Sequence, residues 1–300
     1  MKRPGEMRKY AGMRILTVAL AASLTAGCAM DRAAIADPQA VTAATAETVT
    51  LAVREGRTTE LTIWSPAKPR GIAIFSTGMG SWPERYERAA RMLNEEGFVV
   101  VAPLHVDSQR SPDLGKFSMQ ESLVERVADL QASAAYASLR FAGLPTIAVG
   151  HSYGALLSMG EGGAFAGMIP MRIPQVRAVL AFSSPARIPG LVTEQAYSTI
   201  EVPVMMITGT ADTIPAQMGY ANTAADHLLP IESTKTSAYA VVVQDADHGL
   251  VDDANLLARA APAIRLFLQG HGLDDKQAVA RLTAWKAHAG DEFVVKGAMR

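Results

Sequence analysis

The pentapeptide GHSYG at positions 150–154 places a serine between two glycines, in the pattern G-x-S-x-G. It follows a short strand-like segment, Thr146–Val149, and precedes a helix-like segment, Ala155–Met159. A serine on a sharp strand-to-helix turn lies in strained backbone and projects its hydroxyl above the sheet, and glycines beside it let neighbouring segments approach closely. We therefore expect Ser152 to act as a nucleophile. The alternative is a structural serine in a glycine-rich turn.

Two later loops carry the side chains that a serine nucleophile needs. Asp212 follows the strand-like segment Val204–Thr208, and His248 follows the strand-like segment Ala240–Val243. The loops at the carboxyl ends of parallel strands gather at one edge of a sheet. A neutral histidine at that edge can accept the proton of the serine, while an aspartate fixes the ring tautomer and stabilises the imidazolium that forms. The sequence thus predicts a proton relay of Ser152, His248 and Asp212.

Two other carboxylates compete with Asp212 for the role of orienting acid. Asp245 and Asp247 are closer to His248 along the chain. A residue adjacent to a histidine usually points to the opposite side of its loop, so Asp212 is favoured over both.

Other side chains are candidates for lining the site. His105 follows the strand-like segment Phe98–Pro103 and is expected either at the mouth of the site or in a solvated or locally hydrogen-bonded loop. Met79 and Trp82 are candidates for an apolar wall against an acyl or alcohol group, although Trp82 could instead anchor the helix that follows it. His151 is expected to be a packing residue with a satisfied ring nitrogen. No H-x-x-x-H pattern or carboxylate cluster indicates a metal, so we predict neither a metal site nor a cofactor.

The elements that position these residues follow a strand–helix rhythm. An antiparallel hairpin is expected from Glu47–Val53 and Thr58–Trp64 around Glu55-Gly56. Further strands are expected at Gly71–Ser76, Phe98–Pro103, Thr146–Val149, Val176–Phe182, Val204–Thr208 and Ala240–Val243, with helices at Pro83–Glu95, Ser118–Phe141 and Asp253–Gln269. Apolar strands without alternation, separated by helices, predict an α/β fold with a mostly parallel sheet that is covered on both faces.

The composition narrows the class of protein. The chain has 300 residues, 49% of them hydrophobic, which is typical of one globular domain of enzyme size or at most two small ones. Its 28 Lys and Arg against 29 Asp and Glu leave no basic excess for binding nucleic acid. A single cysteine, Cys28, excludes an internal disulfide framework and a multi-cysteine zinc site.

The beginning of the chain has the layout of a secretory signal peptide. The apolar run Ile15–Ala26 is too short to span a bilayer core of about 20 helical residues, and it follows a basic segment that contains Lys2, Arg3, Arg8, Lys9 and Arg14. The run ends in LTAGC (24–28), which resembles a bacterial lipoprotein signal. This resemblance implies an exported protein with a lipid anchor on Cys28, held in the outer membrane if the cell is Gram-negative because Ala29 follows. The alternative is an ordinary secreted protein with a chance cysteine.

Three motifs carry a resemblance to the α/β-hydrolases: GHSYG at 150–154, GTADTIP at 209–215 and DADHG at 245–249. Residues 75–108 further resemble the dienelactone-hydrolase and platelet-activating-factor-acetylhydrolase-like esterases and the related polyester-degrading cutinases. The resemblance implies an α/β-hydrolase fold over roughly residues 47–270. It also implies an oxyanion hole made by the backbone amides of Tyr153, which follows the nucleophile, and Met79, in the loop after the Gly71–Ser76 strand.

These observations divide the chain into a lipoprotein-type signal peptide (1–27), a flexible tether (28–46), a catalytic domain (47–270) and a C-terminal extension (271–300). The extension contains an amphipathic piece, Ala278–Ala287, that either packs on the domain or stays loose.

The expected activity is hydrolysis of a small-molecule carboxylic ester through an acyl-enzyme on Ser152. Only Ser183–Val202 intervenes between two of the expected strands, which leaves little room for a large lipase-type lid. Thioesterase, amidase or peptidase activity would use the same side chains, and a lipid-anchored binding protein on an inactive hydrolase scaffold is the alternative outside enzymes. The sequence leaves the natural substrate and the oligomeric state open.

Overall fold

The computed structural model describes residues 46–185, 188, 192–213 and 223–297. These residues belong to one structural unit. The expected signal peptide, its lipidation site Cys28 and nearly all of the expected tether lie outside the described residues.

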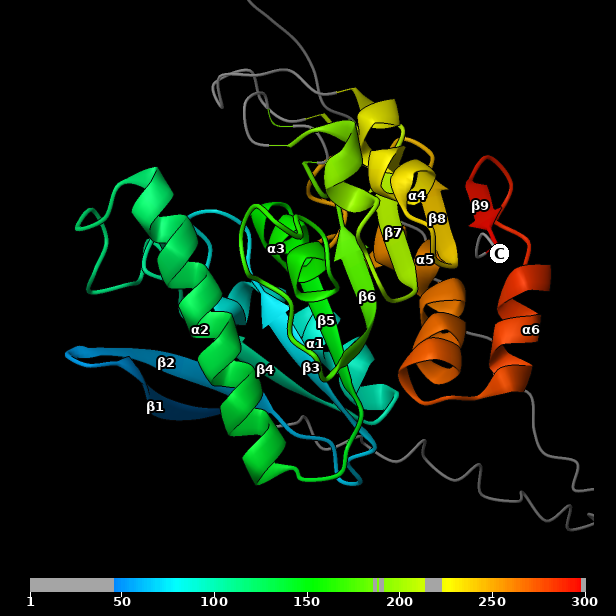
Figure 1. Ribbon diagram of the computed structural model, residues 1–300. Coiled ribbons are helices and arrows are strands. Elements are labelled where there is room, and N and C mark those ends of the chain that lie inside the picture. The colour runs from blue at the N-terminus through cyan, green and yellow to red at the C-terminus, as the bar shows by residue number, and fades with distance from the viewer. Residues whose placement is uncertain (1–45, 186–187, 189–191, 214–222, 298–300) are drawn as a thin grey trace, which may run out of the picture. The chain divides into compact units, whose positions relative to one another are not determined.

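A nine-stranded sheet forms the centre of the described part of the chain (Figure 1). In chain order its strands are β1 (Ala46–Arg54), β2 (Arg57–Trp64), β3 (Gly71–Ser76), β4 (Phe98–Pro103), β5 (Thr146–His151), β6 (Val176–Phe182), β7 (Val204–Gly209), β8 (Ala238–Val243) and β9 (Glu292–Lys296). Their spatial order is β1-β2-β4-β3-β5-β6-β7-β8-β9. Strands β3 to β8 run parallel to one another, whereas β1, β2 and β9 pair antiparallel. The expected mostly parallel sheet with an N-terminal antiparallel hairpin is confirmed.

Helices cover both faces of this sheet, which explains why its inner strands are apolar throughout. The helices are α1 (Glu87–Glu95), α2 (Met119–Arg140), α3 (Tyr153–Glu161), α4 (Leu229–Ser233), α5 (Ala254–Phe267) and α6 (Lys276–Ala284), with 3-10 turns at η1 (Pro83–Tyr86), η2 (Glu194–Tyr197) and η4 (Ala224–Leu228) and a π-helical turn at η5 (Leu268–Gly272). Side chains of α2, α3 and α4 pack in the core on one face, and those of α1, α5 and α6 pack in the core on the other. Every residue of β3, β4, β5, β7 and β8 is buried.

Helix α2 brings three charged side chains into the buried side of its first half. A capping box defines its start: the Glu121 amide donates to the Ser118 hydroxyl, and the Ser118 amide donates to the Glu121 carboxylate. Further along, Glu125, Arg126 and Asp129 are all buried. Charges so placed must have partners. Arg57 of β2 contacts Glu125 and Asp129, and Arg126 contacts the loops that follow β3 and β4.

The C-terminal segment contributes to the sheet, which the sequence did not indicate. Strand β9 pairs antiparallel with β8, and Phe293 of β9 stacks on Tyr239 and meets the edge of Trp285. Helix α6, at the expected amphipathic piece, buries Leu282 in the core together with residues of α5. The described part of the 271–300 segment therefore completes one edge of the sheet. The hydrophobic pattern of a five-residue edge strand with half-exposed side chains is too weak to predict that strand from the sequence.

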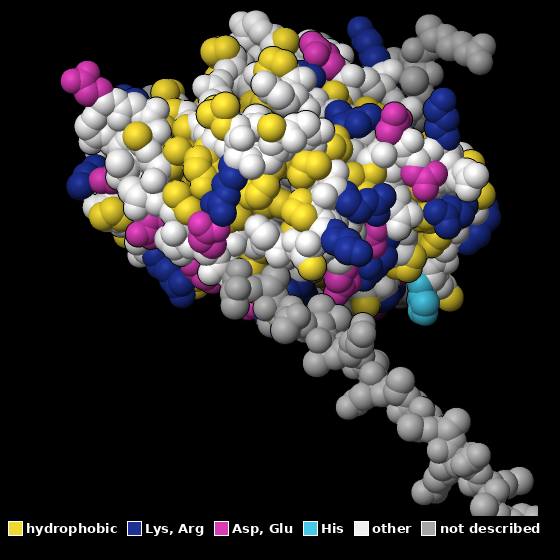
Figure 2. Space-filling model, turned by 90° about the horizontal axis from the view of Figure 1, so that it is seen from below, with side chains coloured by type: hydrophobic (Ala, Val, Ile, Leu, Met, Phe, Trp, Pro, Cys, Tyr) yellow, Lys and Arg dark blue, Asp and Glu magenta, His cyan; other side chains and the backbone are white. Residues whose placement is uncertain are grey.

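Figure 2 shows basic and acidic side chains intermingled on the face seen from below. Within the described ranges, none of the helices combines the length and the apolar character that crossing a membrane requires.

One buried carboxyl has an unusual setting. Glu161, at the end of α3, is 1% exposed, and neither of its carboxyl oxygens has a hydrogen bond of good geometry among the described residues. Burial raises its pKa to about 8, and the nearby Ser158 hydroxyl offsets only part of this effect. The folded protein therefore holds Glu161 neutral up to about pH 8, whereas the unfolded chain ionises this group near its ordinary pKa of 4.5.

We expect the free energy of unfolding to fall with rising pH between pH 4.5 and 8 because of this one residue. In that window the folded state binds a proton that the unfolded state releases, a loss of at most about 1.4 kcal/mol per pH unit. Chemical denaturation at intervals from pH 5 to 9 should show a shallower decline for Glu161→Gln than for the unmodified protein. Glu60→Gln, at an exposed carboxyl of β2, is the control. Identical pH slopes for the Glu161 variant and the unmodified protein would contradict this account.

Candidate active site

Ser152 occupies the sharp turn between β5 and α3. Its backbone has φ 54° and ψ −122°, a conformation that non-glycine residues rarely adopt. A Cβ added at Gly150 would lie 2.3 Å from the Gly154 carbonyl oxygen, and one added at Gly154 would lie 2.0 Å from the Ser76 carbonyl oxygen. Both glycines of the pentapeptide are thus required by close backbone approach, which is the reason that the sequence pattern suggested.

The structure brings together the three residues of the expected relay. Ser152 Oγ lies 2.9 Å from His248 Nε2, and His248 Nδ1 lies 2.8 Å from Asp212 Oδ1. Asp212 follows the end of β7 and is fully buried, while His248 lies on the loop after β8 with its side chain 26% exposed. The Thr208 hydroxyl donates to the second carboxylate oxygen of Asp212 at 2.7 Å. The arrangement can move a proton from the serine to the histidine while the aspartate holds the ring.

The charge of Asp212 is maintained despite its burial. Burial by itself raises the pKa of this carboxyl, but the hydrogen bond from His248, the nearby His227 and the Thr208 hydroxyl together bring the pKa below its ordinary value. The rival carboxylates lie elsewhere: Asp245 and Asp247 are exposed, and Asp247 accepts the Gly249 amide of its own loop.

His227 is a neighbour of the acid that sequence analysis did not find. It lies in η4, is fully buried, and places Nε2 3.1 Å from the Asp212 carbonyl oxygen and 3.4 Å from Asp212 Oδ1. Its Nδ1 contacts the Ser184 carbonyl oxygen. Nothing in the local sequence marks this residue, because its partners come from loops after two other strands.

His151 and Tyr86 connect three parts of the site. The His151 Nε2–H donates to the His248 carbonyl oxygen at 2.9 Å, and His151 Nδ1 accepts from the Tyr86 hydroxyl at 2.9 Å. That hydroxyl in turn accepts the Gly78 amide at 3.0 Å. Burial, helped by the neighbouring His248, lowers the pKa of His151 to about 4, so its ring stays neutral at physiological pH. The chain of bonds therefore joins the loop after β3, the residue before the nucleophile and the loop that carries His248.

The loop after β3 lies directly against the nucleophile. A Cβ added at Gly78 would be 3.6 Å from the Ser152 Cβ. The Ser81 amide donates to the Gly78 carbonyl oxygen at 3.1 Å, and Gly80 has φ +70°, which closes a tight turn with Met79 at its outer side. Of the two expected oxyanion donors, Met79 follows Gly78 in this loop, and Tyr153 follows Ser152 as the first residue of α3.

His105 does not line the mouth of the site. Its side chain is fully buried, with Nδ1 3.0 Å from Asp129 Oδ2 and Nε2 3.1 Å from the Ser76 hydroxyl. The mouth-lining prediction was wrong, and the alternative of a solvated or locally hydrogen-bonded loop does not describe His105 either, because its two partners lie on α2 and at the end of β3. Burial, and then the charge of Arg126, lower the pKa of His105.

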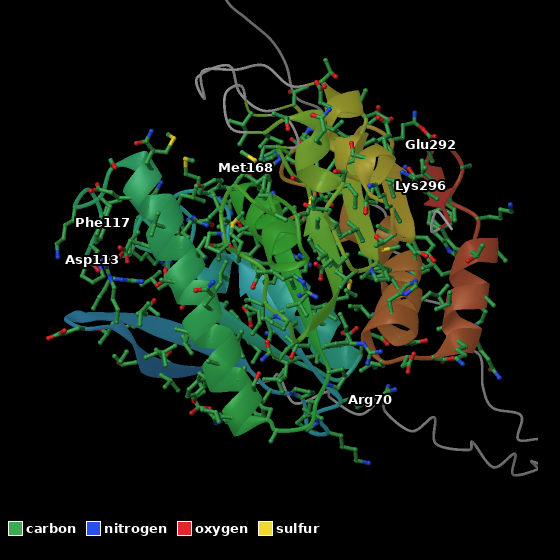
Figure 3. All side chains as sticks on the ribbon, viewed as in Figure 1. Arg70, Asp113, Phe117, Met168, Glu292 and Lys296 are labelled. Atoms are coloured by element: carbon green, nitrogen blue, oxygen red, sulfur yellow. The ribbon has the colours of Figure 1, made fainter. Side chains whose placement is uncertain are left out.

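Trp82 lies immediately before η1, and the guanidinium of Arg110 covers its ring at 4.3 Å from the ring centroid. Met79 is 38% exposed and lines a pocket of about 240 Å³ next to the nucleophile turn. The other residues that line this pocket are Val106, Asp107, Leu114, Gly115, Phe117, Met119, Ser122 and Tyr153. Figure 3 shows Phe117 on the loop that leads into α2. The pocket is mainly apolar and does not include Trp82.

Over the ranges that the structure describes, no group of three or more His, Cys, Asp and Glu side chains could hold a metal ion.

A family model described as serine aminopeptidase, S33, matches residues 67–189, a segment that includes Ser152 but neither Asp212 nor His248. No curated protein sequence matches the chain.

Many solved structures are similar. Esterase 2 of Thermogutta terrifontis, phosphorylated by paraoxon, has a TM-score of 0.55 at 17% identity, covering 76% of this chain and 95% of that one. The dienelactone hydrolase of Anabaena variabilis has a TM-score of 0.55 at 17% identity, covering 76% of this chain and 98% of that one. A puromycin-hydrolyzing peptidase of Mycobacterium tuberculosis has a TM-score of 0.57 at 12% identity, covering 78% of this chain and 40% of that one. These likenesses show that the chain has the α/β-hydrolase fold, as its motifs indicated.

Removing the hydroxyl of Tyr86 should destabilise the fold. In Tyr86→Phe the buried Gly78 amide loses its acceptor and His151 Nδ1 loses its donor, so we expect the free energy of unfolding to fall by about 1–3 kcal/mol. Chemical denaturation measures this change. Tyr136→Phe is the matched control, because within the described ranges that hydroxyl accepts one exposed hydrogen bond, from Arg140. Equal effects of the two variants would disprove a structural role for the buried chain of bonds.

Proposed function

We propose that this chain is a serine hydrolase that cleaves carboxylic esters through an acyl-enzyme on Ser152. The observation that carries the proposal is the unbroken contact from Ser152 through His248 to the buried Asp212, with the serine on a strained turn. Structural likeness to esterases and to a dienelactone hydrolase supports the same class of reaction.

Each group then has a defined part in the reaction. Ser152 Oγ attacks the ester carbonyl while His248 Nε2 takes its proton, and the same proton passes to the alcohol as the carbonyl–oxygen bond breaks. Water next attacks the acyl-enzyme with His248 again as base, and the acid leaves. The amides of Tyr153 and Met79 donate to the oxyanion, and each donor of this kind lowers a barrier by about 3 kcal/mol.

The mainly apolar pocket beside Met79 and Tyr153 supports a substrate with an apolar group next to the scissile bond. Leu114 and Met119 form an exposed part of its lining, 54% and 70% exposed. An apolar chain that enters this pocket covers these side chains and gains the free energy of their burial.

Amide hydrolysis is the second candidate, because the matching family model is one of serine aminopeptidases and one similar structure is a puromycin-hydrolyzing peptidase. Nitrophenyl esters, the corresponding thioesters and anilides with the same acyl group distinguish these activities by their relative kcat/KM. We expect the esters to be cleaved fastest.

A fluorophosphonate probe should label the protein on Ser152. We expect labelling to be lost in Ser152→Ala, with the melting temperature nearly unchanged. We also expect kcat for ester hydrolysis to fall by about 10³–10⁴-fold in Asp212→Asn, because an amide in place of the carboxylate favours the wrong tautomer of His248. Mass spectrometry of the labelled peptide identifies the modified residue.

Two results would count against this assignment. Labelling at another serine would place the nucleophile elsewhere. A folded protein without residues 1–28 that reacts with no probe would favour a binding protein on an inactive scaffold.

The pocket can be tested separately from the chemistry. In Leu114→Asp a carboxylate enters the apolar lining, so kcat/KM for long-chain nitrophenyl esters should fall by roughly three- to tenfold while the acetate ester is unaffected. Leu139→Asp is the matched control, because Leu139 is an exposed leucine of α2 that does not line the pocket. A uniform loss across all chain lengths would show that the pocket does not hold the substrate.

We also propose that the protein is exported and lipid-anchored through Cys28. The support is the basic segment, the apolar run and the LTAGC sequence. Cells fed an alkyne-tagged palmitate should label the full chain, and Cys28→Ala should abolish that label. Equal labelling of both would remove the anchor from the proposal.

A further inference from the structure

We propose that Arg126 of α2 is the positioning residue that aims the Met79 amide at the reacting oxygen. The inference rests on the proposed serine-hydrolase function and assigns a role to a residue that neither the motifs nor the relay includes. Arg126 is the largest fully buried side chain among the described residues, at 0% exposure. A buried guanidinium is costly, so its partners should reveal why the structure retains it.

Arg126 holds the loop after β3 by its carbonyl groups. Its Nη1 donates to the Thr77 carbonyl oxygen at 2.8 Å, and its Nη2 donates to the Gly78 carbonyl oxygen at 3.0 Å. These two successive peptide groups lead directly to Met79. Both carbonyls are therefore turned toward α2.

Because the peptide bond is planar, a contact that fixes the direction of a carbonyl group also fixes the direction of the amide that follows it. In a trans peptide the C=O of one residue and the N–H of the next point in opposite directions. Because the Thr77 carbonyl faces Arg126, the Gly78 amide points away from α2, and it donates to the Tyr86 hydroxyl at 3.0 Å. By the same geometry, the bond from Arg126 to the Gly78 carbonyl turns the Met79 amide away from α2.

The carboxylate of Asp107 holds the same loop together with Arg126, and we call these two side chains the clamp. Arg126 Nε lies 2.7 Å from Asp107 Oδ1, and Nη2 lies 2.9 Å from Oδ2. Asp107 Oδ2 also accepts the Gly80 amide at 3.1 Å, on the far side of Met79. Burial opposes ionisation of Asp107, but the bonds from Arg126 lower the pKa of this carboxyl below its ordinary value, so it remains a carboxylate. Met79 is thus bracketed by bonded peptide groups on both sides.

The same guanidinium also reaches the second expected donor. Its central carbon lies 4.9 Å from the centroid of the Tyr153 ring, in a cation–π contact. Arg126 therefore touches the side chain or the loop of both residues whose amides are proposed to bind the oxyanion. Lysine cannot replace it, because one ammonium lacks the planar set of donors that reaches two carbonyls and a carboxylate together.

The test compares Arg126→Lys with Arg172→Lys. Arg172 is the matched control because it also binds a carboxylate, that of Glu201, and backbone carbonyls, among them that of Glu161, but contacts neither the loop after β3 nor Ser152. Both variants keep the charge and lose a guanidinium clamp. Activity is measured well below the melting temperature of each variant, on a short ester that does not depend on the apolar pocket.

We expect kcat of Arg126→Lys to fall by roughly 10–100-fold with KM within about twofold, because the lost alignment affects the oxyanion and not the bound ester. The affinity for a trifluoromethyl ketone, which forms an oxyanion on adding to the serine, should fall by a similar factor. Amide hydrogen exchange of Gly78 and Gly80 should accelerate at least tenfold. Arg172→Lys should leave all three quantities unchanged.

Unchanged exchange in Arg126→Lys would overturn the proposal, and so would faster exchange with unchanged kcat and ketone affinity. If the unmodified protein neither hydrolyses esters nor reacts with the probe, the proposed function fails, and the role of Arg126 toward an oxyanion is rejected with it, whatever the exchange rates show. If Arg126→Lys does not fold, Asp107→Asn, which keeps the shape of the carboxylate, serves instead. Faster exchange of Gly80 together with a kcat at least threefold lower would support the clamp, and absence of either change would refute it.

Discussion

The first turn of α3 lies so close to the end of β3 that no side chain fits between them at Gly154. This contact fixes where the helix begins and leaves Ser152 with φ 54°, a conformation that costs about 1–3 kcal/mol. Main-chain bonds hold the strained residue in place: the Ser152 amide donates to the Phe182 carbonyl, and the Ser152 carbonyl accepts the Ala155 amide, each at 2.9 Å. The packing of β3, β5 and α3 thus stabilises a turn that would not persist by itself.

Buried charges on α2 connect this turn to the N-terminal hairpin. Arg57 of β2 contacts both Glu125, at 2.6 Å, and Asp129, at 2.7 Å, and Asp129 holds His105, which meets the hydroxyl at the end of β3. Apolar side chains of the same volume could stabilise such a layer as well or better. Paired charges add directional specificity to the packing, because each hydrogen-bond donor must face a particular acceptor. The layer therefore determines how α2 lies along the sheet, and α2 in turn carries Arg126 to the loop beside the nucleophile.

Buried groups that do not take part in the proposed reaction hold His248 and Asp212 in position. His151 bonds the backbone of His248, Thr208 bonds the carboxylate of Asp212, and His227 packs against the same aspartate. Each of these partners is at least 90% buried, so its geometry varies little. Catalytic groups whose orientation is set before substrate arrives need little reorganisation during reaction, and this preorganisation is the main source of electrostatic rate enhancement.

The strand–helix order, the serine turn and the order Ser152, Asp212, His248 could all be predicted from the residues, because glycine spacing and strand ends are local features of the chain. The parallel sheet then brings the loops at these strand ends to one edge. The inward position of His105, the place of His227 beside the acid, the pairing of β9 and the contacts of Arg126 emerged only from the folded chain. Those four depend on which elements lie against one another across long stretches of chain. A buried polar side chain takes the partners that packing brings to it, and nothing in its own neighbourhood along the chain specifies them.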